Sequence, residues 1–416
     1  MHRGGSMSSR RTQLSFLLIS VAVFLLSFGP RARAHEVDTH WAEGEHLELG
    51  ETGSKLACGD LGLKGSDCPV GRILRKDARL TFRYGEVLAS ADFYNTADEM
   101  DADEETGIGK VIRCAHRQLA KHPVHRPDED RYDGCEVNGF FNLRGYLEVV
   151  SHNYDHFGWN NMKAYVSYHR QALDQARQAF FKRKSNPSAS RRHLHRALIL
   201  NAYADHYLTD AFAAGHIRLP RIQIKKWARE GLSGIFKETR GDGLAMILHD
   251  SEGRNLKTGV EQGLRVKNSH GNIWITRGDQ YLHVDSNLHD PTYVQPLTAV
   301  RESVKEVLLA WRTGVLPEGV YQATLHVPFV HDVSLVEKLT PKYQRMKQED
   351  IISALYSALS FFPRLLFPSS DYERMLRHLP EIFEIFRQDV ANDLVSRPEL
   401  SERLPEAYLE AYLNVH

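Results

Sequence analysis

Apolar residues recur at helical spacing along most of this chain, and the pattern predicts a mainly α-helical protein. One helical run begins near Arg192 and continues to Gly215 without interior proline or glycine. The polar segment after Lys182, which contains Pro187, joins it to the preceding run. This short linker predicts that the two helices pack as an antiparallel hairpin. Runs with helical character cover Leu80–Met100, Asn142–Ala179, Arg192–Gly215, Lys225–Lys237, Thr298–Thr313 and three stretches between Pro317 and His416.

Three stretches have a different pattern. His35–Gly85 is polar and glycine-rich, and helical periodicity is hard to see in it. Val266–His283 alternates between apolar and polar residues and contains Gly271-Asn272, which is typical of a small β-hairpin. Ile351–Phe367 is strongly apolar and is expected to form a packed core helix. A surface that touches a membrane is the alternative interpretation of this last stretch.

The first 34 residues have the features of a signal peptide. Basic residues precede an apolar run from Leu14 to Phe28, and Ala32-Arg33-Ala34 matches the cleavage pattern. The apolar run is shorter than the ~20 residues that a membrane-spanning helix needs. An uncleaved membrane anchor is the alternative. Removal of residues 1–34 predicts an exported protein, secreted or periplasmic, whose mature chain begins at His35.

Four cysteines fit an oxidising compartment, where an even number implies disulfide bonds. The expected pairs are sequential, Cys58 with Cys68 and Cys114 with Cys135, because each pair closes a local loop. Their spacing matches no zinc-finger pattern, so a cysteine metal site is not expected.

Composition narrows the function less than the motifs do. The 416 residues leave room for one large domain or two. Lysine plus arginine equals aspartate plus glutamate at 53 each, so no bulk charge indicates binding to nucleic acid or an anionic membrane. The 22 histidines are an excess, for which metal ligation is a common reason.

The strongest candidate for chemistry lies between Asn201 and Pro220. His206 and Asp210 are four residues apart, so a helix places both on one face. Gly215 is a natural helix end, after which His216 can turn back toward them. Imidazole nitrogens and carboxylate oxygens are zinc ligands. The alternative is an ordinary helix end with hydrogen-bonded histidines, but the small alanines around the motif favour an enclosed metal site.

With this spacing the chain resembles the superfamily of zinc-dependent phospholipases C and fungal single-strand nucleases. These are secreted, mostly helical enzymes that hold three zinc ions in one cleft. The resemblance covers roughly His35–Thr313 and rests first on the segment HYLTDAFAAGH. It implies a phospholipase C/nuclease-like domain of residues 35–313, followed by a helical C-terminal extension of residues 314–416. It also implies that Asp210 bridges two zinc ions, and that Asp92 in GEVLASADFY and His156 in NYDHF are further ligands.

The same resemblance implies ligands for the other zinc ions. A later histidine, His249, fits the second zinc, but position 253 is Gly where the family has a carboxylate one helical turn on. Asp250 is therefore the expected carboxylate, with Glu252 as the alternative. The third zinc takes the α-amine of the mature N-terminal residue and a histidine soon after it, which are His35 and His40 here, although the family usually begins with Trp.

These ligands predict phosphoester chemistry. Clustered zinc ions activate a bound water and stabilise charge on phosphate oxygens, and Asp92 either ligates zinc or acts as the general base. We expect a phospholipase C-like phosphodiesterase with up to three zinc ions, a phospholipid or other phosphodiester substrate, peripheral membrane contact and no protein partner. The expected substrate rim is Phe93, Tyr94, Phe157 and Trp159. Arg218 is expected in a surface ion pair, with phosphate contact as the alternative.

Two other functions stay open. A nuclease that cuts single strands would need base-stacking aromatic residues beside a basic groove, and the balanced charge disfavours it. A secreted helical binding protein without catalysis is the third interpretation, and the missing carboxylate at position 253 favours it.

Overall fold

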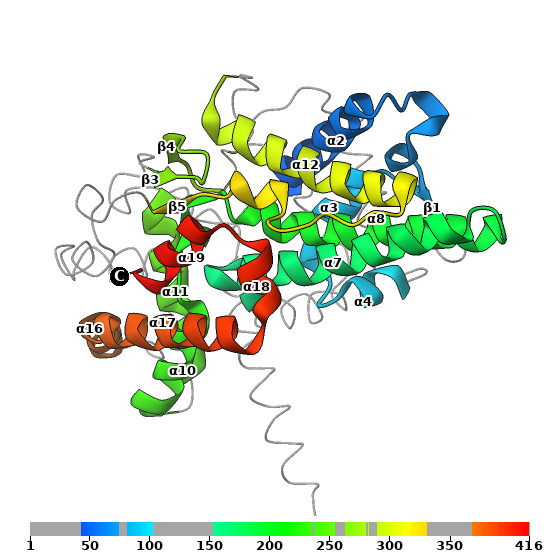
Figure 1. Ribbon diagram of the computed structural model, residues 1–416. Helices are drawn as coiled ribbons and strands as arrows, with labels where there is room; N and C mark the ends of the chain where they lie inside the picture. Colours follow the sequence, from blue (N-terminus) through cyan, green and yellow to red (C-terminus); the bar gives the residue numbers. More distant parts are fainter. Residues whose placement is uncertain are drawn as a thin grey trace, which may run out of the picture.

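The computed structural model describes residues 43–74, 81–102, 153–234, 237–253, 263–279, 282, 289–330 and 368–415. The predicted signal peptide, His35, His40, Cys114, Cys135 and Ile351–Phe367 lie outside these residues. The described chain is mainly α-helical, as predicted (Figure 1). Its α-helices are α2 (Glu43–Asp60), α3 (Tyr84–Ala89), α4 (Ala97–Ala102), α7 (Trp159–Lys182), α8 (Pro187–Asp210), α9 (Ala214–Ile217), α10 (Arg221–Gly231), α11 (Lys237–Gly253), α12 (Pro291–Thr313), α16 (Ser369–Arg377), α17 (Leu379–Ser396), α18 (Pro398–Arg403) and α19 (Glu406–Leu413). Short 3-10 helices are η1 (Gly65–Asp67), η2 (Pro69–Gly71), η3 (Ala91–Phe93), η4 (Tyr154–His156) and η5 (Gln322–Leu325).

Helices α7 and α8 form the centre of the molecule and pack as the predicted antiparallel hairpin. The Asn186 side chain caps α8 by accepting from the Ala189 N–H at 3.0 Å, and Pro187 follows at the first helical position. Near this turn the Ser190 hydroxyl donates to the Ala179 carbonyl at 2.6 Å. The hairpin places the C-terminal end of α8 beside the start of α7, where the candidate ligands gather.

Helix α2 is an 18-residue element that the sequence pattern did not reveal. Its glycines look like loop residues in the sequence, but they allow close helix packing. A Cβ on Gly50 would lie 2.7 Å from the Gly85 Cα in α3, and one on Gly53 would lie 2.8 Å from the Val300 Cγ1 in α12. The helix therefore lies close to both neighbours because it lacks side chains where they touch.

The predicted hairpin is present. Strand β3 (Leu264–Lys267) pairs antiparallel with β4 (Ile273–Thr276), and Gly271 in the turn has a φ of 83°. The strands are shorter than the alternating pattern suggested. A third strand that the pattern did not show, β5 (Phe329–Val330), pairs with the other edge of β3. A separate pair is formed by β1 (Ile73–Leu74) and β2 (Thr81–Phe82).

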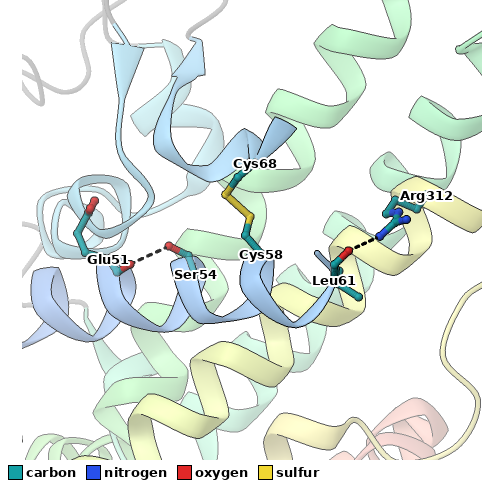
Figure 2. The surroundings of a disulfide bond; sticks show 6 residues. All are labelled: Glu51, Ser54, Cys58, Leu61, Cys68 and Arg312. Atoms are coloured by element: carbon teal, nitrogen blue, oxygen red, sulfur yellow. Dashed lines mark hydrogen bonds between the residues drawn. A yellow bond between two sulfur atoms is a disulfide. The ribbon is translucent and has the colours of Figure 1, made fainter. Parts of the chain in front are cut away.

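One predicted disulfide is present and lies at the end of α2. Cys58 in α2 is bonded to Cys68, which follows η1 (Figure 2). In the same region the Arg312 guanidinium of α12 donates to the Leu61 carbonyl at 2.8 Å. The disulfide ties the segment after η1 back to α2, and the Arg312 bond ties the chain just after α2 to α12.

The C-terminal helices pack against the central helices. Helix α17 contacts α10, α16 and α19, and α18 contacts α7 (Figure 1). Trp159 at the start of α7 donates to Asp393 in α17 at 2.9 Å, and Lys163 reaches the same carboxylate at 2.8 Å. Within the described residues, no helix combines the length and the apolar character needed to cross a membrane.

The glycine contacts of α2 generate a stability prediction. Gly53→Ala places a methyl group against Val300, so we expect it to lower the free energy of unfolding by ~1–3 kcal/mol. Gly59→Ala is the matched control, because a Cβ at Gly59 would have open space and alanine favours helix by ~0.5–1 kcal/mol. Denaturant unfolding of both variants measures the difference. Equal stability of the two would show that α2 does not pack this closely.

Candidate metal centre

Four of the predicted ligands meet in one buried cluster. His206 and Asp210 project from the last turns of α8, as their spacing predicts, while Asp92 lies in η3 and His156 in η4. His206 Nε2 is 3.2 Å from Asp92 Oδ1 and 3.1 Å from His156 Nδ1. His156 Nδ1 is in turn 2.8 Å from Asp210 Oδ2. Segments fifty or more residues apart in sequence therefore bring two imidazoles and two carboxylates together.

A fifth residue, His46 in α2, joins this cluster and was missed at the sequence level. Its Nε2 lies 3.3 Å from Asp210 Oδ1, the carboxylate oxygen that does not face His156. His46 Nδ1 lies 2.8 Å from the Thr209 hydroxyl, which itself donates to a backbone carbonyl of its own helix. The hydroxyl must then accept from His46, so Nδ1 carries the proton and Nε2 offers its lone pair toward Asp210.

A second cluster contains His216 and His249, as predicted, together with Asp279. His216 Nε2 is 3.4 Å from Asp279 Oδ1, and His249 Nε2 is 3.1 Å from Asp279 Oδ2. Helix α9 and helix α11 approach closely here, since a Cβ on Gly215 would lie 2.3 Å from His249 Cδ2. Phe157 stacks on the His216 ring at 4.6 Å and closes one side.

The β3–β4 hairpin positions Asp279 in this cluster. The Ala214 N–H at the start of α9 donates to the Arg277 carbonyl at 2.8 Å. The Thr276 hydroxyl donates to the Phe212 carbonyl at 2.5 Å. These bonds fix the end of β4 against the α8–α9 turn, and Asp279 follows two residues after Arg277.

Asp250, the expected carboxylate ligand, lies on the opposite side of the His249 ring from Asp279. Its Oδ1 accepts from His249 Nδ1 at 3.0 Å, so it orients the imidazole from behind while Asp279 faces Nε2. Glu252, the alternative, pairs with Arg218 through two bonds of 3.1 and 3.0 Å. This pair is buried, so the expectation of a surface ion pair for Arg218 is wrong.

The His216 ring is oriented in the same way as the rings of His46 and His249, by a hydrogen bond at Nδ1. His216 Nδ1 donates to the His156 carbonyl at 2.7 Å, which leaves Nε2 facing Asp279. Three histidines thus have one nitrogen held by the protein and the other turned inward. The same bond links the two clusters, because it joins the backbone of one ligand to the ring of another.

In the first cluster the histidines determine the charge state of the two carboxylates. Burial raises the pKa of Asp210, but the nearby His206 and His156 outweigh it and hold that pKa well below its ordinary value. Burial likewise raises the pKa of Asp92, and the same two histidines reverse the shift. Both carboxylates are therefore ionised at neutral pH in the metal-free protein.

In the second cluster the pKa values of both histidines are raised, which favours their protonated forms. Burial lowers the pKa of His249, but Asp279 and Asp250 outweigh it and raise that pKa to about 10. Burial also lowers the pKa of His216, and Asp279 raises it above its ordinary value. The resulting imidazolium–carboxylate pairs stabilise the metal-free cluster.

The donor atoms fit a metal ion. They form three groups, in each of which the ligand atoms lie within 4.8 Å of one another: His46, His206 and Asp210; Asp92, His156 and His206; His216, His249 and Asp279. His249 Nε2 and His216 Nε2 both face the Asp279 carboxylate, at 3.1 and 3.4 Å, as ligands of one ion would.

Of the predicted rim, Tyr94, Phe157 and Trp159 are described with their side chains. Tyr94 is partly buried and packs against the hydrophobic core. Phe157 lies at the second cluster, as described. Trp159 is buried and bonded to Asp393, so its prediction as a rim residue is wrong: it belongs to the packing between α7 and α17. Comparisons with family models, curated proteins and solved structures found no match to this chain.

The two acidic candidates for the second cluster can be separated by experiment. Asp279→Asn removes a donor that faces both His216 and His249, and we expect it to abolish one bound metal ion. Asp250→Asn removes only the group behind His249, and we expect affinity for that ion to fall ~10–100-fold with the stoichiometry retained at saturation. Metal analysis after equilibrium dialysis measures both. Loss of the ion in Asp250→Asn alone would make Asp250 the ligand.

Metal binding at the second cluster must compete with protons. Since the pKa of His249 is raised to about 10, its ring is protonated at pH 7.5 in the metal-free protein and must lose that proton to bind an ion. We expect metal uptake to release protons, and affinity to rise as pH increases from 7 to 9. Calorimetry in buffers of different ionisation enthalpy counts the protons. His249→Ala should release fewer, and an equal count would contradict the assignment.

Proposed function

We propose that the protein is an exported zinc-dependent phosphodiesterase of the phospholipase C type. The observation that carries this proposal is the carboxylate of Asp210, whose two oxygens face different histidines. Oδ1 faces His46 at 3.3 Å and Oδ2 faces His156 at 2.8 Å. This is the arrangement expected of a carboxylate that bridges two metal ions, the role that the resemblance implies for this residue.

The donor set favours zinc over harder cations. Imidazole nitrogens outnumber carboxylates at both clusters, and magnesium and calcium take oxygen ligands almost exclusively. In the proposed centre, Asp92, His156, His206 and Asp210 would hold one ion, and His46 with Asp210 would contribute to another. His216, His249 and Asp279 would hold a further ion. The resemblance implies that the mature amino terminus, proposed to begin at His35, and His40 add donors for the ion at His46 and Asp210.

Zinc in such a centre supplies a water of lowered pKa and positive charge for phosphate oxygens. The chain's own groups provide the rest. Asp92 is ionised and faces His206, so it can ligate or accept a proton from an attacking water. The histidines carry no charge when they ligate, so they leave the positive charge of the ions available for the phosphate.

Charge near the second cluster favours a single phosphodiester over a nucleic acid strand. Arg221 lies over the Phe157 ring at 4.9 Å, and Lys225 lies over Tyr154 at 5.2 Å. Asp242 is 3.7 Å from Arg221 and 3.3 Å from Lys225, and Glu238 also approaches Lys225. These two cations are matched by two carboxylates. A single strand is usually attracted by an unbalanced positive groove.

We expect the purified mature protein to hydrolyse phosphatidylcholine vesicles or a soluble phosphocholine ester, because a head group phosphodiester suits a compact, charge-balanced centre. Activity should disappear with a chelator and return with zinc. Asp210→Asn should lose more than one ion and reduce kcat by at least ~100-fold, since the bridging oxygen charge is removed. Release of phosphocholine and metal content measure the two effects.

The matched control is Asp205→Asn. This residue lies on the same helix and is buried, but it accepts from Tyr84 and Ser303 away from the cluster, so its variant should keep the zinc. Turnover of single-stranded DNA or RNA with no turnover of lipid would favour the nuclease. Full zinc loading without hydrolysis of either would favour a binding protein.

A further inference from the structure

Helix α9 is too short to hold its own end in place. It contains only Ala214–Ile217, yet it carries His216 and is followed at once by Arg218. The last carbonyls of a helix have no partner within the helix, and in a helix of one turn these are nearly all of its carbonyls. Ile217 is buried, so water does not readily supply the missing bonds. The orientation of His216 depends on groups from elsewhere in the chain.

Groups from outside the helix donate to two of these carbonyls. The Gly158 N–H and the Asn161 side-chain amide donate to the His216 carbonyl at 2.7 and 3.4 Å. The Tyr412 hydroxyl donates to the Ile217 carbonyl. Gly158 is close in space because it follows the ligand His156. Tyr412 is different, since it lies in α19, 195 residues further along the chain.

An aromatic group fixes Tyr412 in this position. Its ring lies 4.7 Å from Tyr408, 5.8 Å from Trp159 and 6.2 Å from Phe386. Phe386 also lies against Gly158, where a Cβ would come within 3.4 Å of its ring. Trp159, one residue after Gly158, is bonded to Asp393 of α17. The C-terminal helices therefore contact the backbone behind both His156 and His216.

We propose that Tyr412 is a positioning residue for the metal site formed by His216, His249 and Asp279. Its hydroxyl caps the carbonyl next to His216 and thereby fixes the direction of Nε2 toward Asp279. This inference rests on the proposed function, and it gives the C-terminal region a role in the centre. The last helix is then part of the metal site's support, although it contributes no ligand.

Tyr412→Phe tests the assignment because it removes one oxygen and keeps the packed ring. We expect the affinity for one zinc ion to fall ~10–100-fold, the size usual when a group supporting a ligand is lost. Tyr408→Phe is the matched control: it lies on the same helix, is also buried and packs against the Tyr412 ring, whereas the bond to the Ile217 carbonyl comes from Tyr412. Competition against a chelator measures affinity, and the visible spectrum of the cobalt-substituted protein reports ligand geometry.

The outcomes separate positioning from general destabilisation. Weaker zinc binding and an altered cobalt spectrum in Tyr412→Phe, with both unchanged in Tyr408→Phe, support the proposal. Equal zinc affinity and equal spectra in the two variants overturn it, whatever their melting temperatures. A wild-type protein that binds zinc but hydrolyses no phosphodiester overturns the proposed function alone, because the affinity comparison still decides the role of Tyr412. A wild-type protein that binds no metal removes the site and overturns both.

Discussion

The buried carboxylate of Asp210 is the constraint on which the centre depends. An ionised carboxylate in the interior is costly unless other groups compensate its charge, and three imidazoles lie close enough to do so. Each of these histidines comes from a different element: α2, η4 and α8. The carboxylate therefore requires three separate parts of the fold to be in place at once. The glycine contacts of α2 and the turn before α7 serve this requirement, because they set how closely His46 and His156 approach.

Local pattern was enough to predict what lies within one helix or one turn. The spacing of His206 and Asp210 predicted their common face, and the linker after Lys182 predicted the central hairpin. His46 was not found because the glycines of α2 hide its helical character, although they are what allows the helix to pack. Its signal was a histidine shortly after the proposed mature N-terminus, but His40 fitted the same description.

Asp279 could not be predicted from the sequence, for a different reason. Nothing in the sequence near His249 points to a residue at the end of a β-hairpin, since the link consists of backbone hydrogen bonds to Phe212 and Ala214. The same holds for Tyr412, whose partner is a carbonyl. Backbone groups are nearly identical at every position, so contacts with them leave no pattern in the amino-acid sequence. Ligands that share an element can be predicted from spacing, whereas supporting contacts of this kind need the tertiary structure.

The metal-free centre is stabilised by the groups that a metal ion would use. Asp279 faces two histidines whose pKa values are raised, so protons take the place of the positive charge that an ion would bring. The geometry can therefore form before metal arrives, and binding exchanges protons for an ion without rebuilding the cluster. This arrangement also sets a limit on affinity, because every proton held by an ion pair must be displaced. A centre organised in this way combines a preformed shape with metal binding that weakens as the medium becomes acidic.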